Sequence, residues 1–194
     1  MLNTKELNKI KNDMDLFDKQ RESIILLSRI ILKASKSAIY STHRTEFQKA
    51  KKQISEAEIN ITKAEKMIKK IPELRKVGIY SSALEEYAEA KFFYGYVKDK
   101  KLPKVSELAT NAEEYLRGLC DFTGEMGRLA VISATNKKFK EVKAIRDVVE
   151  EVFGVISSMD LRNGELRKKS DAIKWNLKKI EDILYDISMK KWIQ

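Results

Sequence analysis

Two pairs of acidic residues are the side chains of this 194-residue sequence best suited to chemistry. Glu86 and Glu89 lie three residues apart in the segment LEEYAEA, and Asp121 and Glu125 lie four apart in CDFTGEMGR. On a helix these spacings correspond to turns of about 60° and about 40°, so both members of a pair face one direction. If the two helices pack side by side, the four carboxylates converge.

Apolar neighbours surround both pairs and favour placing the carboxylates toward the interior; these neighbours are Tyr87, Ala88, Ala90 and Phe92, and Leu119, Phe122, Met126 and Leu129. Carboxylates that face inward repel one another and are costly to bury. A hard divalent cation, Mg²⁺ with Mn²⁺ as the alternative, prefers oxygen ligands and relieves that repulsion. Such a metal activates water against a phosphodiester and stabilises the leaving oxygen.

The same spacing also fits a solvated helix face with ordinary Glu–Lys pairs. A di-iron carboxylate bundle is disfavoured, because it needs Glu-x-x-His motifs from two helices. The sequence has one histidine, His43, and the residue three positions before it is Tyr40.

Basic residues outnumber acidic ones, with 39 Lys and Arg against 29 Asp and Glu and a net charge of +10. This balance suits a polyanionic partner such as nucleic acid, and it also suits a merely soluble surface. Near the C-terminus, Arg167, Lys174 and Lys178 are spaced 7 and 4 apart beside an apolar seam. This basic stripe can follow the phosphates of a nucleic-acid strand. The alternative is a solvated basic face.

Four further residues are candidates for nucleic-acid binding. Arg21 occupies an apolar seam position of the first expected helix, and a buried arginine normally has a carboxylate or phosphate partner. A core salt bridge and an RNA contact both satisfy that need. His43 and Arg44 fit either a phosphate contact or a feature of a helix end, and Arg128 lies three residues after Glu125 of the second acidic pair.

The elements that carry these residues read as long helices. Apolar residues recur every three or four positions from Leu7 to Ala38, which is typical of a helix packed on other helices. Five more helices are expected, over about 45–71, 80–98, 105–134, 138–157 and 165–191. We therefore expect an all-α fold: a single domain over residues 1–194, forming an up-and-down bundle of about six to seven long helices. These helices present more apolar length than one bundle buries, which favours a homo-oligomer.

Composition excludes several other classes. Glycine numbers 7 and proline 2, too few for a turn-rich sandwich or barrel. The single cysteine, Cys120, excludes a disulfide framework and a cysteine-based zinc site, and without a histidine partner we expect it to be buried and structural. The sequence shows no apolar run of membrane-spanning length and no signal-peptide core. A soluble, cytoplasmic protein without membrane association is expected.

Four segments resemble the translin and Trax family of helical RNA-binding proteins. DFTGEMGRLAVISAT (residues 121–135) is similar to a Trax segment with an Asp-Leu-Thr-Gly-Glu-Leu core, and EEYAEA (85–90) is similar to the Trax motif Gln-Glu-Tyr-x-Glu-Ala. LRNGELRKKSDAIKWNLKKIEDILYDIS (161–188) resembles the translin C-terminal helix, and residues 21–44 resemble the shared first helix. The resemblance covers nearly the whole chain.

The resemblance implies an all-α protein that assembles as an octameric shell and binds single-stranded RNA and DNA. Trax is a Mg²⁺-dependent endoribonuclease within the complex called component 3 promoter of RISC. Its catalytic carboxylates correspond to Glu86, Glu89, Asp121 and Glu125 here. Translin has basic or histidine residues in the helix that corresponds to residues 80–98, and it lacks the activity. The mixture of Trax-like acids and a translin-like C-terminal helix resembles a single-chain, archaeal-type member that forms a homo-octamer. The expected function is Mg²⁺-dependent cleavage of single-stranded RNA. The alternative is a non-enzymatic, translin-like scaffold for single-stranded RNA or DNA.

Overall fold

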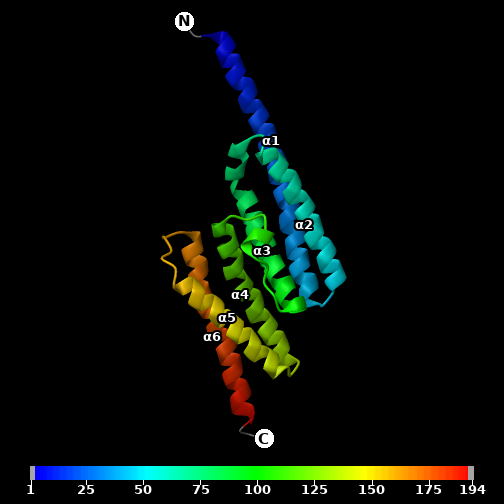
Figure 1. Ribbon diagram of the computed structural model, residues 1–194, viewed down its shortest axis with the longest axis vertical. Coiled ribbons are helices and arrows are strands. Elements are labelled where there is room, and N and C mark those ends of the chain that lie inside the picture. Colours follow the sequence, from blue (N-terminus) through cyan, green and yellow to red (C-terminus); the bar gives the residue numbers. More distant parts are fainter. Residues whose placement is uncertain (1–2, 192–194) are drawn as a thin grey trace.

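Helices make up nearly all of the computed structural model, which describes residues 3–191 (Figure 1). The α-helices are α1 (Thr4–His43), α2 (Phe47–Ile68), α3 (Gly78–Asp99), α4 (Ala112–Thr135), α5 (Phe139–Ser157) and α6 (Glu165–Lys191), with short 3₁₀ turns η1 (Pro72–Lys76) and η2 (Val105–Glu107). The expected all-α fold is confirmed. No helix within residues 3–191 combines the length and the apolar character needed to cross a membrane.

The helices form two groups that meet along one seam. α1 packs on α2 and α3, while α4 packs on α5 and α6, and the contact between α3 and α4 joins the groups (Figure 1). Aromatic side chains fill this joint: Phe92 of α3 and Phe122 of α4 are fully buried, with ring centroids 6.1 Å apart. One continuous apolar core therefore fixes α3 against α4, the two helices that carry the acidic pairs.

The order of the helices departs from a pure up-and-down bundle at one connection. α3 and α4 run parallel, since Ser81 contacts Glu114 near their starts and Tyr96 contacts Phe122 further along. The connection between them returns along α3, and the Tyr115 hydroxyl donates to the carbonyl of Pro103 within it. The expected helix over 105–134 therefore begins only at Ala112, after η2.

A capping box fixes the first turn of α4. The Asn111 side chain accepts a hydrogen bond from the N–H of Glu114, whose carboxylate in turn accepts from the N–H of Asn111. The Glu114 side chain is 1% exposed and also accepts from Arg75 at 2.6 Å and from Ser81 at 2.8 Å. This buried network ties the start of α4 to η1 and α3.

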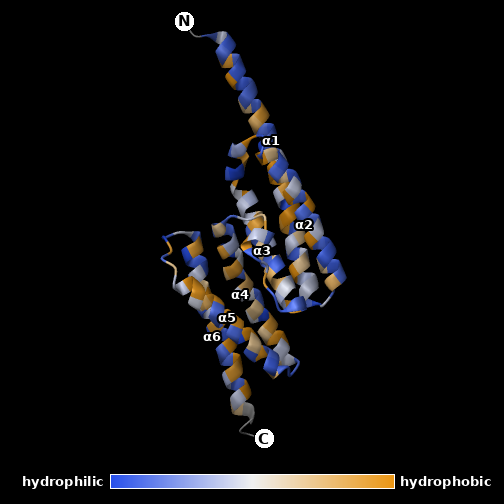
Figure 2. Cartoon of the chain, in the orientation of Figure 1, coloured by the Kyte–Doolittle hydropathy of each residue, from blue (hydrophilic) through white to orange (hydrophobic). Residues whose placement is uncertain are grey.

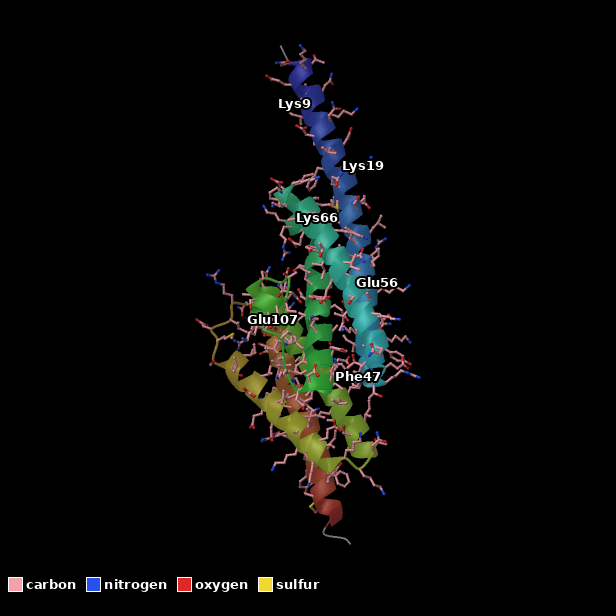
Figure 3. The ribbon with its side chains drawn as sticks, turned by 45° about the vertical axis from the view of Figure 1, so that its right-hand side comes forward. Lys9, Lys19, Phe47, Glu56, Lys66 and Glu107 are labelled. Atoms are coloured by element: carbon pink, nitrogen blue, oxygen red, sulfur yellow. The ribbon has the colours of Figure 1, made fainter. Side chains whose placement is uncertain are left out.

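The first turns of α1 extend beyond the rest of the bundle as an arm (Figure 1). α1 has 40 residues and α2 has 22, so α1 is about 27 Å longer at 1.5 Å per residue. Leu7, Ile10 and Met14 are exposed on this arm, and Figure 2 shows hydrophobic residues along it. Lys9 and Lys19 lie beyond the end of α2 (Figure 3). The apolar stripe of the first helix is therefore not buried within the bundle over these first turns.

Candidate active site: a carboxylate cluster between α3 and α4

A close approach of two helix backbones brings the acidic pairs together. A Cβ added at Gly118 of α4 would lie 2.8 Å from the Cβ of Ala88 and 2.8 Å from the carbonyl oxygen of Glu85, both on α3. Because glycine has no Cβ, α4 approaches α3 more closely at this point than any other residue would allow. One turn further along α4, Asp121 follows on the side that faces α3.

Glu89 is the most deeply placed of the four carboxylates. Its side chain is 9% exposed, and within residues 3–191 it has no hydrogen bond or ion pair. Burial, with a smaller contribution from the neighbouring carboxylates Glu86, Asp121 and Glu125, raises the pKa of Glu89 to about 9. Burial also raises the pKa of Glu86, with Asp121 and Glu125 adding to the shift and Lys36 opposing it. The four predicted side chains therefore lie within electrostatic reach of one another.

Side chains from two neighbouring helices pair with three carboxylates of this cluster. Lys169 of α6 donates to Asp121, and His43 of α1 contacts Glu125. Lys36, also on α1, lies 3.9 Å from Glu86. In this arrangement the described part of the chain contains no group of three His, Cys, Asp or Glu side chains close enough to hold a metal ion.

The chemistry of the carboxylate cluster nevertheless fits a hard divalent cation. All four side chains offer oxygen donors, which Mg²⁺ prefers. Glu89 is nine-tenths buried and lacks a cationic partner, so a divalent ion would supply the charge that it lacks. Glu86, Glu89, Asp121 and Glu125 would hold the ion once Asp121 and Glu125 release Lys169 and His43.

His43 is placed inside the site rather than on an open surface. Its side chain is 4% exposed, its Nε2 contacts Glu125, and its ring centroid lies 4.3 Å from that of Phe93. The Nδ1 atom is buried without a hydrogen-bond partner. The sequence left a phosphate contact and a helix-end role open for His43, and the structure adds that it orients a carboxylate of the cluster.

Three residues of the site were missed from the sequence. Glu85 is 7% exposed and accepts from Arg117 at 2.7 Å, while Lys36 and Lys169 supply cations. Lys36 lies seven residues before His43, so both share one face of α1. Lys169 lies three residues after Leu166, at a seam position of α6. A charged residue at a seam position is the signal that had drawn attention to Arg21.

The remaining nucleic-acid-binding candidates are exposed. The seam position of Arg21 predicted burial, which is wrong: its side chain is 48% exposed, and among the described residues it pairs only with Glu22, at 3.1 Å. Arg44 pairs with the neighbouring Glu46 at 2.7 Å. Arg128 is 53% exposed and lies 3.8 Å from Glu125, at the rim of the carboxylate cluster.

The basic stripe of α6 is exposed but lies on another face from the carboxylate cluster. At 100° per residue, its three residues lie about 140–180° around the helix axis from Lys169, which faces the cluster. Arg167 lies 3.5 Å from Asp171, and Lys178 lies over the exposed ring of Trp175. The stripe and the cluster of one protomer therefore face different directions.

Cys120 is buried beside the cluster, as predicted for a structural cysteine. Burial, together with the neighbouring Asp121, raises the pKa of its thiol to about 12. A thiol in this environment stays protonated and is no nucleophile. The aromatic residues of α3 are also mostly core: Tyr80, Tyr87, Phe92, Phe93 and Tyr96 are buried.

Sequence comparison links this architecture to known relatives. Translin from Gallus gallus is 35% identical over 78 residues, which cover 40% of this chain and 34% of the translin, so the match spans about a third of that protein's length. A translin-associated protein X homolog from Schizosaccharomyces pombe is 25% identical over 198 residues, covering 93% of this chain and 86% of its own. The uncharacterized protein MJ0175 of Methanocaldococcus jannaschii is 29% identical over 178 residues, covering 90% and 79%.

Solved structures show the same fold. The crystal structure of apo-NeC3PO superposes with a TM-score of 0.87 at 25% identity, covering 95% of this chain and 97% of that one. The structure of AfC3PO in a duplex RNA complex superposes with a TM-score of 0.74 at 19% identity, covering 97% of this chain and 100% of that one. The model of the Translin family matches residues 19–191. With this match over most of its length, the chain belongs to the translin family.

Proposed function

We propose that this protein is a Mg²⁺-dependent endoribonuclease that binds and cleaves single-stranded RNA. The observation that carries the proposal is Glu89, a nine-tenths buried carboxylate without a cationic partner, set among three further carboxylates. A purely structural site has no need to gather three acids around a buried carboxyl group that lacks a cationic partner, because such a group is costly to bury in its charged form. The net charge of +10 is also consistent with a polyanionic partner such as RNA.

Different residues would bind the metal, orient its carboxylate ligands and attract the RNA. Bound Mg²⁺ would supply an activated water and charge stabilisation at the scissile phosphate. Glu89 and Asp121 would hold the ion from α3 and α4, and His43 would keep Glu125 oriented through their contact. Arg128, exposed at the rim, would attract the phosphate backbone without reading bases.

Assembly belongs to the same proposal. AfC3PO was solved with duplex RNA, which supports RNA as the partner of this fold. The exposed apolar residues on the α1 arm support a homo-oligomer, since an isolated amphipathic helix is marginal in water without packing. We propose a homo-octamer, in which the basic stripe of one protomer can serve the carboxylate cluster of another.

A cleavage assay with two variants tests the proposal. Labelled single-stranded RNA is incubated with the wild type, Glu89→Ala or Asp121→Ala, in Mg²⁺ or in EDTA, and RNA binding is followed by fluorescence anisotropy. We expect Mg²⁺-dependent cleavage by the wild type only, with RNA affinity unchanged in both variants. Undiminished Mg²⁺-dependent cleavage by both variants would remove the carboxylate cluster from the mechanism.

A non-enzymatic scaffold for single-stranded RNA or DNA is the second candidate. The ion pair of Asp121 with Lys169 and the contact of Glu125 with His43 favour it, because they give two carboxylates of the cluster a partner without any metal. RNA binding without cleavage in both Mg²⁺ and EDTA would favour this candidate.

A further inference from the structure

Lys169 reaches two carboxylates that lie on different helices. It projects from α6, and its ammonium group donates to Asp121 of α4 while lying 3.5 Å from Oε2 of Glu85 on α3. Its side chain is 29% exposed, so the charge is partly withdrawn from water. The ammonium group therefore has two alternative anionic partners within reach.

Glu85 can accept Lys169 fully without losing its present partner. Arg117 donates to Oε1 of Glu85 at 2.7 Å, whereas Lys169 lies near Oε2, so each oxygen faces one cation. Glu85 is 7% exposed and is held in place by α3, α4 and α6 together. A carboxylate fixed in this way can serve as a second ion-pair partner for the ammonium group.

We infer that Lys169 is an internal counter-ion that occupies Asp121 in the metal-free protein and moves to Glu85 when Asp121 takes a divalent cation. The inference rests on the proposed function, because it assumes that the carboxylate cluster binds a metal. Two cations cannot share Asp121 without repulsion, so the metal and the ammonium group compete for it. Lys169 is thus a positioning residue, which neutralises part of the negative charge of the carboxylate cluster in the metal-free protein.

Competition of this kind predicts opposite effects on metal affinity for substitutions of Lys169 and of Glu85. Lys169→Met removes the competitor and keeps the side-chain length, so metal binding should tighten by about fivefold or more. Glu85→Gln removes the second ion-pair partner, so Lys169 stays paired with Asp121 and metal binding should weaken by a similar factor. Because Glu85 acts through Lys169, its effect should vanish in the Lys169→Met background. A general electrostatic effect of Glu85 would persist there.

The experiment is a Mn²⁺ titration of the full-length protein followed by the electron paramagnetic resonance signal of free Mn²⁺. Wild type, both single variants and the double variant are compared at one protein concentration, with far-ultraviolet circular dichroism as the check on folding. Lys168→Met is the matched control, since Lys168 is exposed and pairs with Glu165 at 2.7 Å. If Glu85→Gln does not fold, Glu85→Asp replaces it, because the shorter carboxylate keeps the charge but draws back from Lys169.

We expect tighter binding for Lys169→Met, weaker binding for Glu85→Gln, and no Glu85 effect in the double variant. Unchanged or weaker Mn²⁺ binding by Lys169→Met would overturn the inference while leaving the proposed function intact. Additive effects of the two substitutions would overturn the role of Glu85 as the receiving group. A wild type that binds no Mn²⁺ at all would overturn the proposed function as well, so the two failures are distinguishable.

Discussion

Replacement of Glu89 by glutamine should stabilise the metal-free protein at neutral pH. The folded state holds Glu89 with a pKa of about 9, whereas the unfolded chain restores an ordinary value near 4.5. Between these values the folded protein binds a proton that the unfolded chain releases, so stability falls as pH rises from about 4.5 to about 9. A glutamine cannot ionise, so the variant escapes this loss.

The magnitude follows from the two pKa values of Glu89. At pH 7 the unfolded chain lies about 2.5 pH units above its own value, and each unit corresponds to 1.36 kcal/mol, which gives about 3 kcal/mol. For a domain of this size that amounts to a rise in melting temperature of about 6–12 °C. The advantage of Glu89→Gln should be absent at or below about pH 4.5 and should grow steadily above it.

The assay is urea unfolding of wild type and Glu89→Gln in EDTA from pH 4.5 to 8, at one fixed protein concentration because oligomers unfold in a concentration-dependent way. Glu151→Gln on the exposed side of α5 is the control and should follow the wild-type curve. A Glu89→Gln curve parallel to that of the wild type across this pH range would show that Glu89 is not a desolvated carboxyl. That result would refute the electrostatic description of the site.

Three further changes test other parts of the structure. Gly118→Ala should cost about 2 kcal/mol in urea unfolding because its methyl group clashes with α3, whereas Gly127→Ala meets nothing within 4 Å and should be neutral or slightly stabilising; equal effects would contradict the close approach. Arg75→Met should cost about 3 kcal/mol by leaving the buried Glu114 without its cation, and a loss below about 0.5 kcal/mol would contradict this role. Changing the three residues of the basic stripe to glutamine should reduce the slope of log RNA affinity against log salt by about 2, and an unchanged slope would show that the stripe does not contact phosphates.

Local sequence patterns predicted the helices and half of the site. The apolar periodicity predicted the positions of α2, α5 and α6 to within a few residues. The pairing of Glu86 with Glu89 follows from helix geometry alone, since residues three apart share a face. Such relations depend only on neighbours along the chain.

The cations of the site depend on packing that no local pattern specifies. Lys36 and Lys169 reach the carboxylate cluster because α1 and α6, which come from opposite ends of the sequence, both pack beside it. The parallel order of α3 and α4 arises from the connection that passes back along α3, where Gly95 leaves room for the carbonyl of Lys101. Arg21 remains 48% exposed and pairs with the neighbouring Glu22. These outcomes are set by long-range contacts.

The most direct test of the proposed ribonuclease is the metal dependence of cleavage by Asp121→Cys. A thiolate is a poor ligand for Mg²⁺ and a good ligand for softer cations such as Cd²⁺. If the side chain at position 121 holds the metal that cleaves RNA, the variant should lose cleavage in Mg²⁺ and regain it in Cd²⁺, with single-stranded RNA affinity unchanged. Cleavage by the variant in Mg²⁺ at the wild-type rate would contradict a metal-ligating role for Asp121 and, with it, the proposed catalytic site.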